Sequence, residues 1–268
     1  MLTISQQEEA IYIEKSVIEN LLSQFKRSIG ITRKDLRMYI KKFPIILQAI
    51  LFPTILFFAF TTRRSVPPIF MVTGLGVLIL FMASTAIAPI TLPWETLFKN
   101  LERIITTPIS IRTILVGDII ASVLFSTIIS FIPLMLGLLL FSLWASVNLI
   151  GLLVIALGLL LASFAFSCFS ALLSVPPTTH PSSTMILTIT IKFPILMISP
   201  LFMAIEPNSI GLLSPLTYIL DILNYSISGA SVFGAYGLLI DFGILSIFGI
   251  VCLLLSFKLH EITLQKRF

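Results

Sequence analysis

Residues 114–175 read ILVGDIIASVLFSTIISFIPLMLGLLLFSLWASVNLIGLLVIALGLLLASFAFSCFSALLSV and contain one charged residue, Asp118. The hydrocarbon core of a bilayer is about 30 Å thick and a helix rises about 1.5 Å per residue, so about 20 apolar residues cross it. This stretch is therefore long enough for two crossings. Only a couple of residues around Ala145 and Ser146 separate them, which predicts an antiparallel helical hairpin.

Six apolar stretches reach, or nearly reach, the length of a membrane span: residues 43–60, 66–90, 114–144, 147–175, 184–205 and 236–257. Hydrophobic residues make up 57% of the 268 residues and charged residues 11%, a composition that a water-soluble fold of this size cannot hide from solvent. We therefore predict an all-α integral membrane protein with one membrane domain. Residues 1–42 precede its six-span bundle at 43–257, and residues 258–268 form a tail.

A seventh apolar stretch, residues 210–233, contains Pro215, Asp221 and Asn224. With six spans, fifteen Lys and Arg residues share one side with both termini, and only Arg63 and Arg64 lie opposite. The positive-inside rule then places both termini in the cytoplasm. We therefore expect residues 210–233 to be a broken, re-entrant helix in the outer half of the membrane, its polar backbone shielded by neighbouring helices.

The segment before the first span is amphipathic. Its apolar residues recur at helical spacing, namely Ile18, Leu21, Leu22, Phe25 and Ile29. This pattern predicts an interfacial helix that lies along the membrane surface, or alternatively one that covers a soluble partner. We expect Gly30 to end this helix and Thr32, with Asp35, to cap the next one.

The most informative loop lies between the second and third predicted spans, at residues 91–113. Thr91 as a cap, Pro93 in the first turn and a stop at Thr107-Pro108 predict a short cytoplasmic helix. Its predicted polar side carries mixed charge that suits docking of a cytoplasmic partner through ion pairs, and consists of Glu95, Lys99, Glu102 and Arg103. An ordinary solvated surface helix is the alternative.

The predicted spans contain three charges, Asp118, Lys192 and Asp241. The aspartates lie about one turn from the span ends, where they can reach water or headgroups. Lys192 lies deeper, just before Pro194, and is a candidate for the transport pathway. Its long side chain could instead snorkel to the interface.

The chain offers no sign of an enzyme. It contains no G-x-x-x-x-G-K-[ST], H-E-x-x-H or G-x-S-x-G motif, and its two histidines are too far apart in sequence to suggest a metal site. Cys168 and Cys252 lie in apolar runs, as packing residues do. The basic residues are confined to tails and short loops, where they face lipid headgroups, so no nucleic-acid partner is expected.

The order of these segments resembles the type-2 ABC exporter permeases. The most specific match is ETLFKNLERIITTPIS at residues 95–110 followed by ILVGD at 114–118, which looks like the coupling-helix region of that family. SPLTYILD at 214–221 matches the outer re-entrant helix, and the N-terminal amphipathic segment matches the connecting helix.

The resemblance implies a permease domain that spans the whole chain, in a prokaryotic cell membrane. Two such chains, identical or paralogous, would pair, and each would dock an ABC ATP-binding subunit through the loop around Trp94 to Arg103. The cofactors ATP and Mg would be bound by those partners, because this chain has no phosphate-binding loop. Closure of the ATPases would switch the shared cavity between inward- and outward-facing states, with a lipid, hydrophobic drug or glycan as cargo. A secondary transporter or channel, or a membrane subunit without transport activity, are the alternatives.

Overall fold

The computed structural model describes residues 22–38, 43–62, 66–98, 109–176, 181–201, 206 and 210–264. In these residues the chain is helical and contains no strand. The elements after the first helix, which covers residues 22–38, are α2 (Phe43–Ile46), η1 (Leu47–Leu51), α3 (Phe52–Thr61), α4 (Pro68–Ser84), α5 (Ala88–Leu97), α7 (Ile111–Leu140), η2 (Leu143–Ser146), α8 (Leu149–Leu173), α9 (Pro181–Ile198), η3 (Ile210–Leu213), α10 (Pro215–Ser228), η4 (Gly234–Tyr236) and α11 (Gly237–Leu264).

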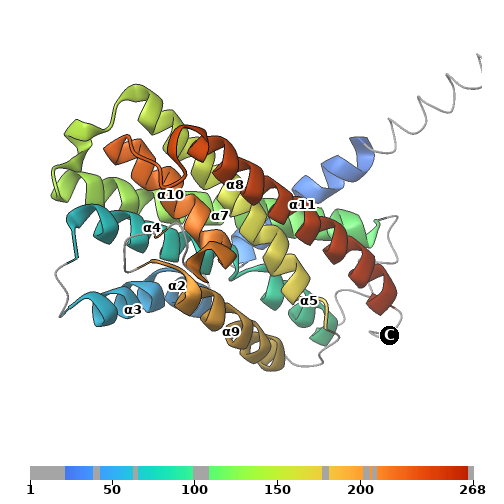
Figure 1. Cartoon of the computed structure of the whole chain (residues 1–268). Coiled ribbons are helices and arrows are strands. Elements are labelled where there is room, and N and C mark those ends of the chain that lie inside the picture. The colour runs from blue at the N-terminus through green and yellow to red at the C-terminus, as the bar shows by residue number, and fades with distance from the viewer. Residues whose placement is uncertain are drawn as a thin grey trace, which may run out of the picture.

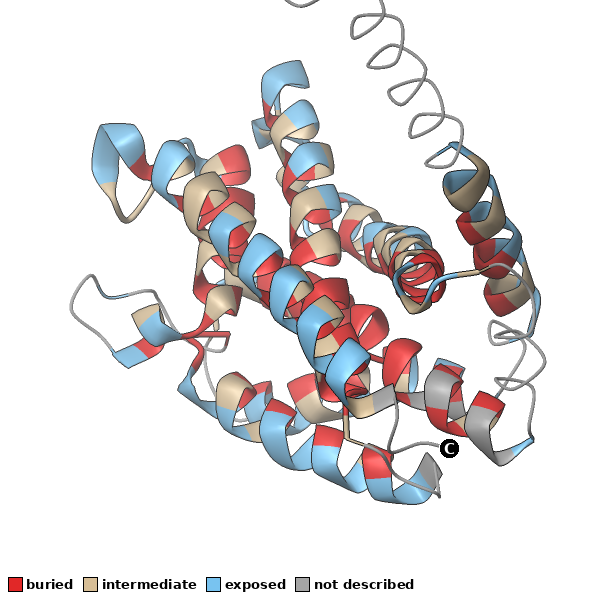
Figure 2. Ribbon diagram, turned by 90° about the vertical axis from the view of Figure 1, so that its right-hand side faces the viewer, coloured by how far each residue is buried: buried red, intermediate tan, exposed pale blue. Residues whose placement is uncertain are grey.

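Among the described residues, three stretches of helix are long and apolar enough to cross a membrane: Ile111–Leu140, Leu149–Leu173 and Gly234–Thr263. Three shorter apolar helices, Leu47–Thr61, Pro68–Ser84 and Ser182–Ile198, coincide with the first, second and fifth predicted spans. Figure 2 shows exposed residues along the outward sides of the helices and buried residues where helices meet. Many of the exposed residues are large and apolar, which indicates a membrane protein.

Helix α8 lies at the centre of the bundle, with α7, α10 and α11 around it (Figure 1). Phe166 of α8 meets Phe81 of α4 edge to face, with ring centroids 5.2 Å apart. Ser163, Ser167 and Ala171 of α8, small residues spaced four apart, are fully buried, so this side of α8 packs inside the chain.

The predicted hairpin is confirmed, since α7 and α8 pack side by side. Its connection is longer than expected because Ser142 adopts a left-handed conformation (φ 56°) after α7 and η2 follows it. Helix α8 begins where the Asn148 side chain accepts a hydrogen bond from the Gly151 amide, 2.7 Å away.

Residues 210–233 form a broken helix, as predicted. Helix α10 begins at Pro215 after the Ser214 cap, and it ends at Gly229, whose φ of 75° favours glycine. The inner side of α10 packs against α8, where a Cβ on Gly158 would lie 2.7 Å from Ile222 Cγ2. The small residue therefore sets this close approach.

Two expected boundaries are wrong. The first helix continues through Gly30 to residue 38, so Gly30 does not end it and Thr32 does not cap a new one. The predicted second span breaks at Thr85, because α4 stops at Ser84 and α5 starts at Ala88. At this break the Thr85 amide and hydroxyl both donate to the Phe81 carbonyl, at 3.1 and 2.6 Å, and the chain turns after this last helical bond.

Candidate functional site

A cluster of charged side chains joins the first helix, α5 and α7. Lys34 forms an ion pair with Glu95 of α5, and its Nζ lies 3.3 Å from Asp35 Oδ1. Asp118 of α7 accepts a hydrogen bond from the Thr91 hydroxyl at 3.0 Å and interacts electrostatically with Asp35 and Glu95. Asp35, Glu95 and Asp118 are buried, so one lysine serves three acidic groups.

The ionisation of this cluster follows from burial and charge. Burial by itself disfavours the Lys34 ammonium, but the carboxylates of Asp35 and Glu95 outweigh it and raise the pKa of Lys34 above its usual value. Burial raises the pKa of Glu95, and the nearby Lys34 opposes that rise. Lys34 therefore supplies a positive charge that offsets part of the negative charge of this junction.

The first helix is also fixed to α7 directly. The Thr32 hydroxyl donates to the Gly117 carbonyl at 3.0 Å, and a Cβ on Gly117 would lie 2.7 Å from Ile31 Cβ. Three apolar residues beside the packed face, Leu22, Phe25 and Ile29, are exposed. The helix thus has one face locked to the bundle and another that is uncovered.

The structure changes the predicted docking surface. Glu95 is buried and paired inside the chain, so it does not lie on an exposed polar side as predicted. Trp94 is half-buried and stacks on Phe98, with ring centroids 5.2 Å apart. Thr91 does not cap α5, because the helix begins at Ala88 and the Thr91 hydroxyl bonds Asp118. Lys99, Glu102 and Arg103 lie outside the described residues.

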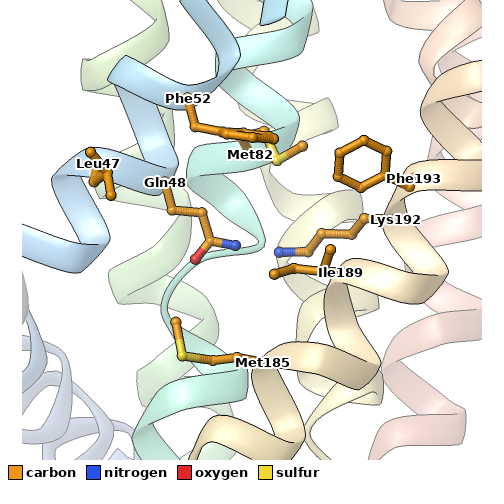
Figure 3. A pocket seen from close by; sticks show the side chains of 8 residues that line it. All are labelled: Leu47, Gln48, Phe52, Met82, Met185, Ile189, Lys192 and Phe193. Carbon is orange, nitrogen blue, oxygen red and sulfur yellow. The ribbon is translucent and has the colours of Figure 1, made fainter. Parts of the chain in front are cut away.

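A second site is a cavity of about 320 Å³ between the helix that starts at Phe43 and α9. Figure 3 shows its lining: Leu47, Gln48, Phe52, Met82, Met185, Ile189, Lys192 and Phe193. Lys192 is its charged residue. Its Nζ donates to the Thr85 carbonyl, 2.6 Å away, and the side chain is 1% exposed. Lys192 therefore points into the protein and does not snorkel, and no carboxylate among the described residues forms an ion pair with it.

The main chain is irregular at two places near this cavity. On one wall, η1 is a π-helical turn in which the Phe52 amide bonds the Leu47 carbonyl. Pro53 has no amide hydrogen to donate to the Ala49 carbonyl, which favours the wider turn. Beside the cavity, Thr85 caps the C-terminus of α4, so the ammonium of Lys192 meets the negative end of a helix.

Two aspartates meet between α10 and α11. Asp221 accepts hydrogen bonds from the Ser231 hydroxyl at 2.6 Å and from the Val232 amide at 3.1 Å. Asp241 is buried against Asp221, and its carboxylate has no other hydrogen-bond partner within the part of the chain that the structure describes. The expectation that Asp118 and Asp241 reach water is wrong, because both are buried between helices.

The described residues contain no group of three His, Cys, Asp or Glu side chains placed to hold a metal ion. Cys168 and Cys252 are free and buried in the core. The sequence analysis missed Lys34, although a lysine directly before Asp35 on an amphipathic helix was a usable signal. Nothing local in the sequence connects Lys34 to Glu95 or Lys192 to Thr85, because these contacts are 61 and 107 residues apart.

Neither protein-family models nor curated proteins give a match to this chain.

Proposed function

We propose that this chain is the membrane subunit of an ATP-driven exporter, forms its translocation pathway and couples to a separate ATPase subunit. The observation that carries the proposal is the junction of the first helix, α5 and α7, in which Lys34, Glu95, Asp118 and the Thr32–Gly117 contact join a short helix to the membrane bundle. A soluble motor can move membrane helices only through a rigid element continuous with them. The contacts at this junction would make α5 such an element.

In the proposed arrangement the six apolar helices all cross the membrane, α10 is re-entrant on the outer side, and both termini are cytoplasmic. The fifteen basic residues of the predicted inner side include Lys192, which is buried within the chain. Without it, fourteen basic residues lie on the inner side, compared with Arg63 and Arg64 on the outer side. Cysteine labelling of intact cells tests this. A membrane-impermeant reagent should reach cysteines at Ser65 and Asn208 but not at Asn100 and Lys266; labelling at Lys266 would mean that residues 210–233 cross fully.

Two copies of this chain, or this chain and a paralogue, would enclose the pathway and dock two ABC ATP-binding subunits that bind ATP and Mg. The docking surface would include Lys99, Glu102 and Arg103, with Trp94 at its edge. Glu95 would not contact the ATPase subunit, although the sequence pattern predicted that it would. It would instead hold α5 in place through its ion pair with Lys34.

The energy source separates this proposal from a secondary transporter. We would prepare inside-out vesicles from cells that overproduce the chain with its partner, and offer a fluorescent lipid, a hydrophobic dye and a labelled glycan. At least one of these should accumulate only when ATP is hydrolysed, and an ionophore should not prevent it. Accumulation that follows an ion gradient without ATP would instead support the secondary transporter.

A further inference from the structure

We propose that the cavity between the Phe43–Thr61 region and α9 binds an anionic lipid that enters sideways from the bilayer, with Lys192 as the partner of its head group. Binding of such a lipid rests on the chain's lying in a membrane. That the bound lipid is cargo rests on the proposed function.

The charge of the cavity selects an anion. An ammonium has three hydrogens to donate, and the Lys192 Nζ has one described acceptor, the Thr85 carbonyl. A buried cation with so little compensation is costly. An anionic group beside Nζ would supply the missing counter-charge, and the Gln48 amide, toward which Lys192 points in Figure 3, could donate to it.

The remaining lining selects an apolar chain. Apart from Lys192 and Gln48, every residue that lines the cavity is apolar. A glycan would leave many hydroxyls without partners there. The volume of about 320 Å³ lies near the lower end of the range of ligand pockets, so the cavity fits a head group with part of one chain.

The cavity is open toward the outside of the bundle. Leu47 and Phe52 on one wall are each 38% exposed, and Ile189 on the other is 44% exposed. In a membrane such surfaces contact acyl chains, so a lipid can enter without crossing water. Lys192 lies about 16 Å along α9 from Pro181, near the middle of a crossing, which is too deep for the head group of an ordinary boundary lipid.

Native mass spectrometry of the purified full chain in neutral detergent tests this site. The probes are oleoyl lysophosphatidic acid, monoolein as an uncharged lipid with the same chain, and inorganic phosphate. The wild type should bind lysophosphatidic acid about 10- to 100-fold more tightly than monoolein, as expected for a charged hydrogen bond. Equal affinities would overturn the proposal, and so would competition by inorganic phosphate as effective as by the lipid.

Matched variants locate the site. Lys192→Met should remove the preference for the anionic lipid, whereas Lys192→Arg and the surface control Lys258→Met should keep it. Ile189→Trp should fill the cavity and weaken binding of both lipids, while Ile186→Trp on the exposed side of α9 should not. A preference that survives both Lys192→Met and Ile189→Trp would place the lipid elsewhere.

The oligomeric state of the variants tests which molecule covers the cavity. If Ile189→Trp converts a dimer to a monomer and Ile186→Trp does not, a second copy of the chain covers the cavity and the lipid proposal is wrong.

The lipid-binding measurements need no ATPase, so their outcome is independent of the proposed function. A failure of ATP-driven transport would therefore leave the lipid site standing, and a loss of the lipid preference would leave the exporter proposal standing.

Discussion

The hydroxyl of Thr32 lies 3.0 Å from the main-chain carbonyl of Gly117 and donates a hydrogen bond to it, although 85 residues separate the two. The contact is close because Gly117 has no side chain. A Cβ at that position would lie 2.7 Å from Ile31 Cβ and 2.9 Å from the Ser28 carbonyl oxygen. The first helix is thus held against the beginning of α7, one of the three helices long enough to cross a membrane.

Gly117→Ala should destabilise the protein by about 1–3 kcal/mol, because the added methyl overpacks this crossing. The measurement is the thermal denaturation midpoint of the purified chain. Gly30→Ala is the matched control on the first helix, since no atom lies within 4 Å of its Cβ position. The control should be neutral or slightly stabilising, and equal midpoints for both variants would contradict the close crossing.

Lys34→Met should loosen α5, because it leaves Asp35, Glu95 and Asp118 without their shared cation. We expect the free energy of unfolding to decrease by about 1–3 kcal/mol, because a buried polar group loses its partner. Trp94 reports on α5: in a Trp144→Phe background its emission should shift to the red. Adding Glu95→Gln should recover much of the loss.

The exposed Lys26→Met is the control for that experiment and should leave the emission unchanged. If Lys34→Met and Lys26→Met behave alike, the ion pair does not hold α5 in place.

The stability of the same junction should decrease at alkaline pH. The pKa of Lys34 is raised above its usual 10.5 because the carboxylates of Asp35 and Glu95 outweigh the effect of burial. A raised pKa means that the stabilisation is complete below the usual value and is lost as the pH rises through the folded-state value. Trp94 emission should therefore stay constant from neutral pH to about 10.5 and shift above it.

Lys34→Arg separates this effect from general alkaline unfolding, since a guanidinium stays charged there. The Arg variant should show no shift over the same range. A shift as large in Lys34→Arg as in the wild type would assign the transition to another group.

Reversing two charges in the predicted docking loop, with Glu102→Arg and Arg103→Glu, should weaken binding of the ATPase subunit while the membrane domain stays folded. Exposed charges contribute only about 0–1 kcal/mol per pair to folding, whereas complementary charges guide association. The readouts are the amount of co-purified ATPase and the denaturation midpoint. Lys258→Glu, on an exposed position of α11, is the control.

The sequence was informative wherever local patterns decide structure. The α7–α8 hairpin follows from two long apolar runs with a short connection, and the helix in residues 210–233 follows from an apolar run that contains Pro215, Asp221 and Asn224. Hydrophobicity located these elements because apolar surface must be covered by lipid or by other helices.

Local sequence patterns gave wrong predictions where a contact with a residue far away in the sequence determines the structure. The pattern of its own helix predicts that Glu95 is exposed, but Glu95 is buried and forms an ion pair with Lys34 of another helix. Helix α4 ends with Thr85 as its C-cap inside an apolar run, where the Thr85 carbonyl accepts a hydrogen bond from Lys192, 107 residues away. Gly30 continues a helix, because the packing of Ser28 and Ile31 against α7 outweighs the low helix propensity of one glycine.

The central claim is that this chain works with a separate ATPase, and the most direct measurement is the composition of the complex isolated from its own membrane. Gentle extraction followed by native mass spectrometry should give a complex with two membrane chains and two ATP-binding subunits, and those subunits should hydrolyse ATP. A chain that is isolated without any nucleotide-binding subunit, and that still moves its cargo after reconstitution, would contradict the account.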